Sequence, residues 1–399
     1  MKDVYLVDGV RTPFGNFGGA LKDLDAPALG TIVVSELLGR HASAREAIDQ
    51  VIMGACGQGS EAPNLSRVVA LKAGIPLEKP AYTVHRNCGS GLQAIINAHQ
   101  EILVGEAELV LAGGIESMSS YPYINRDMRW GKRIKHSEFI DSMWEGLTDP
   151  VCGQLMGLTA ENLAVEFGIS REEQDAYAVQ SHKKAFRAAR TGVFGEESMT
   201  VMVPKKAAGR DVPPEPVGTD EGPNPAISAQ MLAAYPTIFK KGGSVTPGNA
   251  CPTNDGAVAL YVASGERADA LGLPKLARIV SYASYGVEPE RMGIGPALAI
   301  PKALAKAGLT LDDIAVFEIN EAFAAQVLSV VKKLGIDPDK LNPNGGAIAL
   351  GHPVGASGAR LALTLGKELQ RRGARYGVAS LCIGGGQGIA MVLENPAAS

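Results

Sequence analysis

The chain has 399 residues, enough for two or three domains of about 150 residues each and for a large buried core. Hydrophobic residues make up 46% and charged residues 20%, which excludes a disordered chain, a coiled coil and a mini-protein held together by disulfides. The 38 basic and 42 acidic residues give a net charge of −4, too balanced for a protein that coats nucleic acid, so we expect no nucleic-acid partner.

The sequence gives no sign of a membrane segment or a metal site. No run of about 18 apolar residues occurs, and Asp3 and Asp8 interrupt the N-terminal apolar stretch, so we expect a cytoplasmic chain with no membrane partner. The cysteines are odd in number, widely scattered and never in C-x-x-C spacing, which disfavours a disulfide framework and a zinc site. They lie at positions 56, 88, 152, 251 and 382.

Short β-branched runs alternate with longer helical patterns along most of the chain. The runs lie at residues 4–7, 51–53, 110–112, 278–281 and 316–319. Such alternation is typical of βαβ units and predicts an α/β fold with mostly parallel sheets.

Residues 121–244 have a different character. They begin with a basic, aromatic stretch at 126–135 and continue into a polar helical pattern at 170–191, where Ser170 and Glu173 form a capping box. Nine prolines follow between Pro204 and Pro252. This composition indicates a loop domain inserted between two α/β parts.

Two stretches, residues 89–114 and 355–386, follow one plan. Each opens with small residues, continues as a helical pattern and runs into an apolar segment that ends in glycines, and the segments upstream of each are also similar. We infer a duplicated chain. The expected division is a first half at 1–120 plus 245–272, a loop domain at 121–244 and a second half at 273–399.

Cys88 follows the extended-looking segment AYTVHRN and precedes Gly89-Ser90-Gly91 and a long helical pattern. It should therefore lie at a strand-to-helix turn, where unpaired amides and the helix dipole favour a thiolate nucleophile. The alternative is a small buried hydrophobe, which is the commonest role of a free cysteine.

Three further residues lie where glycine-rich turns or strand ends expose them. His352, in NPNGGAIALGHPVGASG, could be a base or a hydrogen-bond donor; a structural histidine or a phosphate loop are the alternatives. Cys382 ends an apolar run before Ile383-Gly384-Gly385, whose amides could form an oxyanion hole; a packed strand cysteine is the alternative. Asn320 stands where a strand becomes a helix and by default is a cap. Packing of the two halves about a pseudo-twofold axis would bring these residues to one cleft.

The sequence resembles the thiolase family over almost its whole length. The motifs, in family order, are NCGSGLQAI, GGIESMS, NEAF, NPNGGAIALGHPVGASG and CIGGGQG. The resemblance implies a five-layered αβαβα fold of two similar halves with an inserted loop domain that holds coenzyme A. It also implies a homodimer or homotetramer, with the basic stretch as the tetramerisation loop, and reversible acyl transfer between coenzyme A and the α-carbon of an acyl-CoA. Acyl-CoA and CoA would be substrates, with no separate cofactor or metal.

The resemblance also assigns roles. Cys88 would receive the acyl group while His352 accepts its proton, and Cys382 would be the second acid and base, acting on the α-carbon. His352 and a water held by Asn320 would bind the thioester oxygen of acetyl-CoA, and the amides of Cys88 and Gly384 would bind the oxygen of the acyl-enzyme.

The resemblance to the family is less direct for the residues of the substrate tunnel. Met156 resembles the methionine over the acyl site, and Phe323 together with Ser244 to Ala250 resemble walls of the pantetheine tunnel. Cys251 stands where the family often has serine, and Leu155 stands where its biosynthetic branch usually has histidine. The sequence therefore leaves the acyl-chain preference open.

Four other residues have no catalytic assignment, and two alternative functions stay open. We interpret His85 as structural and Cys56 and Cys152 as packing residues, and Glu116 has no assigned role. A decarboxylating ketoacyl-synthase-type enzyme would share the fold but is expected to use a histidine or asparagine in place of Cys382. A catalytically silent acyl-CoA-binding protein would not need all four polar side chains that are present.

Overall fold

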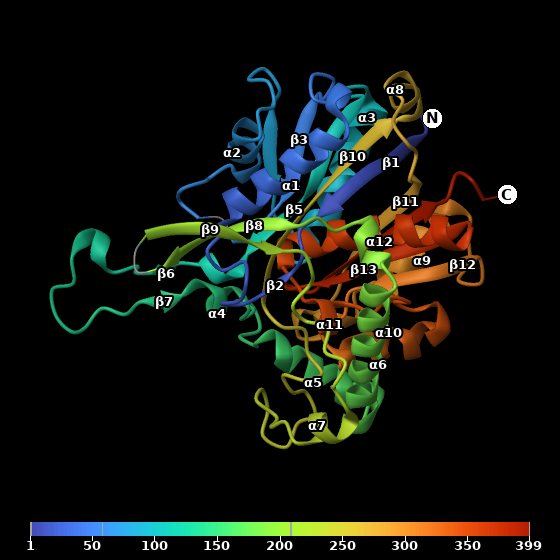
Figure 1. Ribbon diagram of the computed structural model, residues 1–399. Coiled ribbons are helices and arrows are strands. Elements are labelled where there is room, and N and C mark those ends of the chain that lie inside the picture. Colours follow the sequence, from blue (N-terminus) through green and yellow to red (C-terminus); the bar gives the residue numbers. More distant parts are fainter. Residues whose placement is uncertain (1, 58, 208–209, 399) are drawn as a thin grey trace.

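The computed structural model describes residues 2–57, 59–207 and 210–398. Its main strands form one hydrogen-bonded set in the order β12-β13-β14-β11-β1-β10-β5-β3-β4, with β2 paired to β10 (Figure 1). The first part of the chain contributes β1 (Val4–Arg11), β2 (Gly15–Asn16), α1 (Ala26–Arg40), β3 (Gln50–Gly54), α2 (Leu65–Lys72), β4 (Ala81–Val84), α3 (Ser90–Val104), β5 (Leu109–Ser117), β10 (Asn254–Ser264) and α8 (Gly265–Ala270). The last part contributes β11 (Ala277–Gly286), α9 (Pro296–Ala307), β12 (Ile314–Ile319), α10 (Ala324–Leu334), α11 (Ala347–Leu350), α12 (Val354–Arg372), β13 (Tyr376–Ile383) and β14 (Gln387–Glu394).

The two parts repeat one topology, which confirms the duplication inferred from the sequence. In the first, β3 is parallel to β5, β5 antiparallel to β10, and β10 antiparallel to β1. In the second, β12, β13, β14 and β11 pair in the same order and with the same directions. Among the described strands, the two sets are joined at a short β1–β11 ladder, where Tyr5 pairs with Arg278 and Leu6 with Ala277.

The expectation of mostly parallel sheets is wrong, because antiparallel ladders outnumber parallel ones. Strand β14 follows β13 through a tight turn at 384–386, and a tight turn can join only antiparallel strands. Strand β10 returns from the inserted segment in the direction opposite to β5. The β-branched runs themselves lie in strands as predicted, since all five fall within β1, β3, β5, β11 and β12.

Helices α3 and α12 form the central layer of the molecule. They pack against each other and against strands of both sheets. Small residues allow this: a methyl group added at Gly91 would lie 2.8 Å from the Ala359 nitrogen, and one added at Gly358 would lie 2.4 Å from the Leu92 nitrogen. Helices α1 and α2 share the outer core of the first half, and α9 and α10 share that of the second. The result is the expected αβαβα sandwich (Figure 1).

One detail of the predicted repeat differs. The sequence suggested that Gly113 and Gly114 end a strand, as Cys382 and Gly384 do in the second half, but β5 continues to Ser117. The two glycines serve close packing instead, because a methyl group at Gly114 would lie 2.2 Å from the Gly355 carbonyl oxygen of α12.

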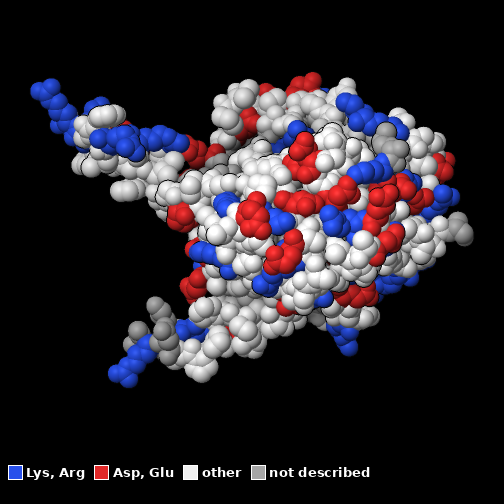
Figure 2. Space-filling model, turned by 90° about the horizontal axis from the view of Figure 1, so that it is seen from above, with Lys and Arg blue, Asp and Glu red and all other residues white. Residues whose placement is uncertain are grey.

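The inserted residues project from the sandwich. They contain β6 (Tyr123–Ile124), β7 (Ile140–Asp141), α4 (Ser142–Gly146), α5 (Met156–Phe167), α6 (Arg171–Arg190), β8 (Val201–Ala207), β9 (Arg210–Val217) and α7 (Ala229–Ala233). Helix α6 begins with the predicted capping box of Ser170 and Glu173. Strands β6 and β7 form the base of a long arm whose tip carries a cluster of Lys and Arg (Figures 1 and 2). Over the described residues, no helix has both the length and the apolar character needed to cross a membrane.

Candidate active site

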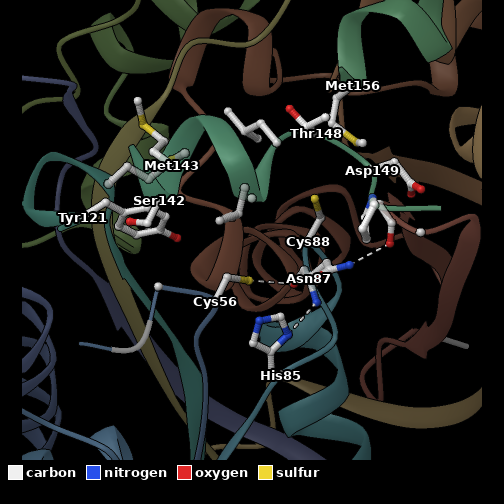
Figure 3. A pocket seen from close by; sticks show the side chains of 18 of the residues that line it. Cys56, His85, Asn87, Cys88, Tyr121, Ser142, Met143, Thr148, Asp149 and Met156 are labelled. Atoms are coloured by element: carbon white, nitrogen blue, oxygen red, sulfur yellow. Dashed lines mark hydrogen bonds between the residues drawn. The ribbon is translucent and has the colours of Figure 1, made fainter. Parts of the chain in front are cut away.

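Cys88 lies on the predicted strand-to-helix turn between β4 and α3. The turn is tight: the Gly89 amide donates to the Arg86 carbonyl at 2.9 Å, and the Ser90 amide donates to the Asn87 carbonyl at 2.9 Å. Asn87 has a φ of +42°, in the left-handed region that asparagine tolerates better than most side chains. This geometry lifts the Cys88 side chain into a cavity, where its sulfur lies near Met156 (Figure 3).

The Cys88 thiol is not the thiolate expected from its helix terminus. Burial raises its pKa to about 11, although hydrogen bonds from the amides of Gly384 and of Cys88 itself act in the opposite direction. The negative charge of Glu116 adds to the increase. Cys88 therefore rests as a thiol, and an attack by its sulfur would require a base.

Gly384 belongs to the turn between β13 and β14, which comes from the other half of the chain. Gly385 and Gly386 adopt φ values of +86° and +80°, which require glycine or another residue tolerant of left-handed backbone. The Asn87 side chain donates a 2.7 Å hydrogen bond from Nδ2 to the Gly384 carbonyl oxygen (Figure 3). Asn87 thus ties the nucleophile turn to the loop that supplies the Gly384 amide.

We expect Asn87→Gly to lower kcat by about 10- to 100-fold with little change in KM, because the Gly384 amide loses its tether while the left-handed backbone is kept. Asn87→Asp should lose more, since a carboxylate would face the Gly384 carbonyl without a proton to donate. Steady-state thiolysis measures both variants. Equal, wild-type kcat values in both would show that the tether does not position the amide.

His352 is buried and held in one tautomer. The Ser357 hydroxyl donates to the Pro353 carbonyl at 2.9 Å, so its oxygen is left to accept from His352 Nδ1, 2.6 Å away. The Nε2 atom then carries the lone pair and can accept a proton. Burial lowers the pKa of His352 to about 3, so the imidazole is neutral at pH 7.

Replacing Ser357 with alanine should therefore slow acylation of Cys88 at least about tenfold, because the imidazole would lose the partner that fixes its tautomer. The measurement is the single-turnover rate of acyl-enzyme formation over a range of acyl-CoA concentrations. An unchanged limiting rate with only weaker substrate binding would contradict this role for Ser357.

Asn320 lies beside His352, with its Nδ2 3.4 Å from the ring nitrogen Nε2. Its Oδ1 atom is buried and, among the described residues, has no hydrogen-bond partner. Asn320 does not cap a helix, because β12 ends at Ile319 and α10 begins only at Ala324. A buried amide with an unused oxygen is suited to hold a water molecule.

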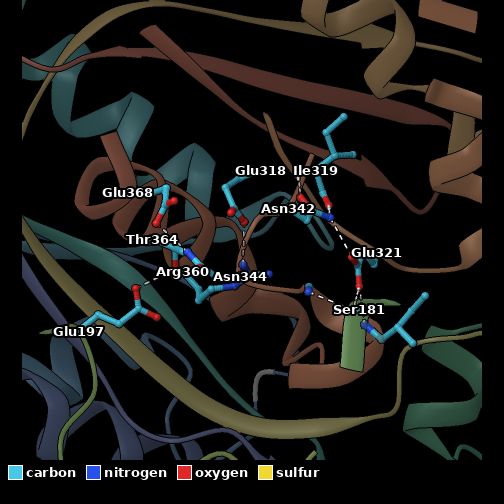
Figure 4. A network of polar contacts seen from close by, with 12 residues as sticks. Ser181, Glu197, Glu318, Ile319, Glu321, Asn342, Asn344, Arg360, Thr364 and Glu368 are labelled. Atoms are coloured by element: carbon cyan, nitrogen blue, oxygen red, sulfur yellow. Dashed lines mark hydrogen bonds and ion pairs between the residues drawn. The ribbon is translucent and has the colours of Figure 1, made fainter. Parts of the chain in front are cut away.

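A network of buried polar side chains fixes the chain around Asn320 (Figure 4). Asn342 exchanges two 2.9 Å hydrogen bonds with the backbone of Ile319. On the other side, the Glu321 carboxylate accepts hydrogen bonds from Tyr177, Ser181, Asn342 and the Ile348 amide. Hydrogen bonds to Ile319 and Glu321 thus fix the chain on both sides of Asn320.

Cys382 is buried at the end of β13. It belongs to an apolar cluster that also contains Met156, Ala250, Cys251 and Phe323. Burial raises the pKa of its thiol well above the usual value, and the charges of Cys88 and Cys251 raise it further. The turn of Cys88 lies against the end of β13, because a methyl group added at Gly89 would lie 2.6 Å from Cδ1 of Ile383, the residue after Cys382.

The predicted tunnel residues fall into two groups. Met156 lines the cavity at Cys88 and also joins the cluster around Cys382. Ala250 and Phe323 face each other in a bridge between their segments, and the Cys251 amide donates to the Ala322 carbonyl at 3.0 Å. Ser244 lies elsewhere, with its amide 2.8 Å from Glu161 and its hydroxyl 2.9 Å from Gln174.

Four residues at or next to the site were not identified as functional from the sequence. Cys56, interpreted as a packing residue, lines the cavity and its sulfur lies 3.1 Å from the Asn87 carbonyl. Asn87 has the tethering role described above. Glu116 accepts from the amides of Cys56 at 3.0 Å, Gly57 at 2.9 Å and Gly355 at 2.8 Å, and so connects the first half to the start of α12. The sequence signal for Glu116 was its place in the GGIES motif. His85, interpreted as structural, also lines the cavity.

This part of the molecule supplies a thiol on a cavity, a neutral buried imidazole, a second buried thiol, and the amides of Gly384 and Cys88 near the Cys88 sulfur. This set suits covalent transfer of a carbonyl-containing group with proton transfer at a neighbouring atom. Within the described ranges, no group of three or more His, Cys, Asp or Glu side chains is arranged to hold a metal ion.

Comparison with known proteins gives matches over the whole chain. Residues 4–266 match the family described as Thiolase, N-terminal domain, and residues 273–395 match Thiolase, C-terminal domain. Among curated relatives, an acetyl-CoA acetyltransferase from Pseudomonas aeruginosa is 47% identical, covering 98% of this chain and 99% of the relative. A probable acetyl-CoA acyltransferase from Staphylococcus aureus is 45% identical, covering 99% of each.

Solved structures agree. The crystal structure of an acetyl-CoA acetyltransferase from Bacillus anthracis superposes with a TM-score of 0.95 at 45% identity, covering 99% of both chains. Human mitochondrial 3-ketoacyl-CoA thiolase in complex with CoA superposes with a TM-score of 0.93 at 45% identity, covering 99% of this chain and 98% of the human one.

Proposed function

The chain belongs to the thiolase family and is an acyltransferase, and from that premise we propose that it cleaves and forms 3-ketoacyl-CoA through an acyl group carried on Cys88. The condensation of two acetyl-CoA to acetoacetyl-CoA and CoA is the simplest case. The observation that supports the assignment is the place of Cys88 on a cavity that it shares with Gly384, from the opposite half, and with Met156, which also packs against the cluster of Cys382.

Cleavage begins when the Cys88 sulfur attacks the 3-keto carbon of the substrate. His352 Nε2 takes the thiol proton as the sulfur attacks, and the C2–C3 bond then breaks. The electron pair of that bond goes to C2, and Cys382 gives its proton to this carbon, which releases acetyl-CoA. In the second half, the proton held by His352 passes to the Cys382 thiolate. The thiol of CoA then attacks the acyl carbon and gives its proton to His352, the bond between Cys88 and the acyl carbon breaks, and the Cys88 sulfur takes that proton as acyl-CoA leaves.

Two sets of donors stabilise the negative charge that develops. The amides of Cys88 and Gly384 lie close enough to the Cys88 sulfur to act on the pKa of its thiol, and they would bind the acyl oxygen. His352, together with a water held by Asn320, would bind the thioester oxygen of the acetyl-CoA enolate. Such donors typically contribute on the order of 100- to 1000-fold to the rate.

Coenzyme A is proposed as substrate and product, with no resident cofactor. The solved complex of a 45% identical thiolase with CoA supports CoA as a ligand. We also propose that the inserted residues 121–244 contact CoA. The long arm that begins at β6 and β7 would be an assembly contact of a homodimer or homotetramer. The protein would be located in the cytoplasm.

Thiolysis of acetoacetyl-CoA by free CoA tests the proposal. The expected product is two molecules of acetyl-CoA for each acetoacetyl-CoA consumed, observed as loss of the acetoacetyl-CoA absorbance and by chromatography. Folded protein that binds CoA but produces no acetyl-CoA would instead support the catalytically silent alternative.

A further inference from the structure

A cavity of about 480 Å³ begins at the Cys88 sulfur and extends under the base of the β6–β7 arm (Figure 3). One wall holds Cys88, Met156 and Gly384. The opposite walls come from the start of the arm and from α4 with the loop after it. The apolar side chains there are Tyr121, Pro122, Ile124, Met143, Leu147 and Val151.

The lining indicates an uncharged guest. No Lys or Arg is among the described residues that line the cavity, and Asp149 is its one carboxylate. The amides of Val151 at 2.8 Å and Cys152 at 3.1 Å donate to Asp149 Oδ1, whereas its buried Oδ2 has no hydrogen-bond partner among the described residues. The phosphates of CoA would find no cation here, whereas an alkyl chain would meet mostly hydrocarbon.

The cavity is also larger than an acetyl group requires. An acetyl group has three non-hydrogen atoms, whereas 480 Å³ falls within the range of roughly 300–1,000 Å³ found for pockets that take drug-sized ligands. Acetyl on Cys88 would leave most of the apolar wall in contact with water. A longer chain would displace that water, with roughly a fourfold gain for each methylene group buried.

We propose that this cavity receives the alkyl chain of a medium-length 3-ketoacyl-CoA, so that the enzyme prefers such substrates to acetoacetyl-CoA. The inference rests on the proposed function, because the chain enters the cavity as part of the acyl group that Cys88 carries. It answers the question of acyl-chain preference that the sequence leaves open.

Strand β6 offers a way to shorten the cavity. Ile124 is half-buried and lines the cavity, whereas its neighbour Tyr123 is 65% exposed and lies outside the set of lining residues. Neighbouring residues of a strand point to opposite faces. Ile124→Trp should fill the cavity, and Tyr123→Trp is the matched control on the other face.

The experiment measures kcat/KM for thiolysis of acetoacetyl-, 3-ketohexanoyl-, 3-ketooctanoyl- and 3-ketodecanoyl-CoA. For the unmodified enzyme we expect a rise of at least about tenfold from acetoacetyl- to 3-ketooctanoyl-CoA. Ile124→Trp should lower that ratio about tenfold, and Tyr123→Trp should preserve it. Leu147→Phe fills the cavity from another wall and replaces Ile124→Trp if circular dichroism shows that variant to be unfolded.

Three results would overturn the inference. Values of kcat/KM that fall steadily beyond acetoacetyl-CoA would show that the cavity takes no alkyl chain. An unchanged ratio in both cavity-filling variants would place the chain elsewhere. A higher KM for CoA, with the ratio unchanged, would assign the cavity to the pantetheine arm. Absence of thiolysis with every substrate, acetoacetyl-CoA included, would instead reject the proposed function itself.

Discussion

Cys88→Ala should lower thiolysis on the order of 10⁵-fold or more, the size of effect seen when a covalent nucleophile is removed from a hydrolase. The loss should appear in kcat while the binding of acyl-CoA persists, because the cavity walls and the apolar cluster around Cys382 remain. Cys88→Ser should be nearly as inactive. A hydroxyl is harder to deprotonate than a thiol, and the thiol here already needs His352 as its base, since its pKa is about 11.

Cys152→Ala is the matched control for that experiment. Cys152 is half-exposed in the turn held by Asp149 and does not line the cavity. We expect it to retain wild-type turnover and thermal stability. Turnover in Cys88→Ala within tenfold of wild type would mean that another group carries the acyl chain.

Cys382→Ala should separate the two halves of the reaction. Condensation of acetyl-CoA and cleavage of acetoacetyl-CoA should fall by about 10²- to 10⁴-fold, the usual contribution of a general acid or base. Acylation of Cys88 should persist, because that step moves the Cys88 proton to His352 and from there to the departing sulfur of CoA, without Cys382. The measurement is exchange of the acetyl group between acetyl-CoA and labelled CoA, which needs acylation alone.

The same variant tests the alternative enzyme class. A decarboxylating condensing enzyme generates its carbanion by loss of carbon dioxide and does not need the Cys382 thiol. Condensation of a malonyl donor that survives in Cys382→Ala would favour that class. Loss of acetyl exchange together with condensation would show that Cys382 supports the fold of the site rather than proton transfer.

The main side chains of the site could be predicted because each stands next to a glycine-rich turn. Cys88, His352 and Cys382 lie on turns or at a strand end set by local backbone geometry, which short motifs encode directly. The duplication was visible for the same reason, since α3 and α12 need small residues where they cross, and Gly91 and Gly358 mark that crossing.

The residues that escaped prediction act across the two halves. Asn87 reaches Gly384, 297 residues away, and Glu116 reaches Gly355, 239 residues away. No periodicity or local motif encodes such pairs. The prediction of mostly parallel sheets was wrong because an apolar β-branched run has the same appearance in the sequence of a parallel or an antiparallel sheet. The high pKa of Cys88 was missed because the helix terminus is visible in a sequence, whereas the burial that outweighs it is not.

The most direct test of the account is the site of acylation in the unmodified enzyme. Incubation with acetyl-CoA, rapid quenching in acid and peptide mass spectrometry should find the mass of one acetyl group on the peptide that contains Cys88. Addition of free CoA before quenching should remove it. An acetyl group on Cys56, Cys251 or Cys382 in its place, or one that CoA cannot remove, would contradict the central role of Cys88.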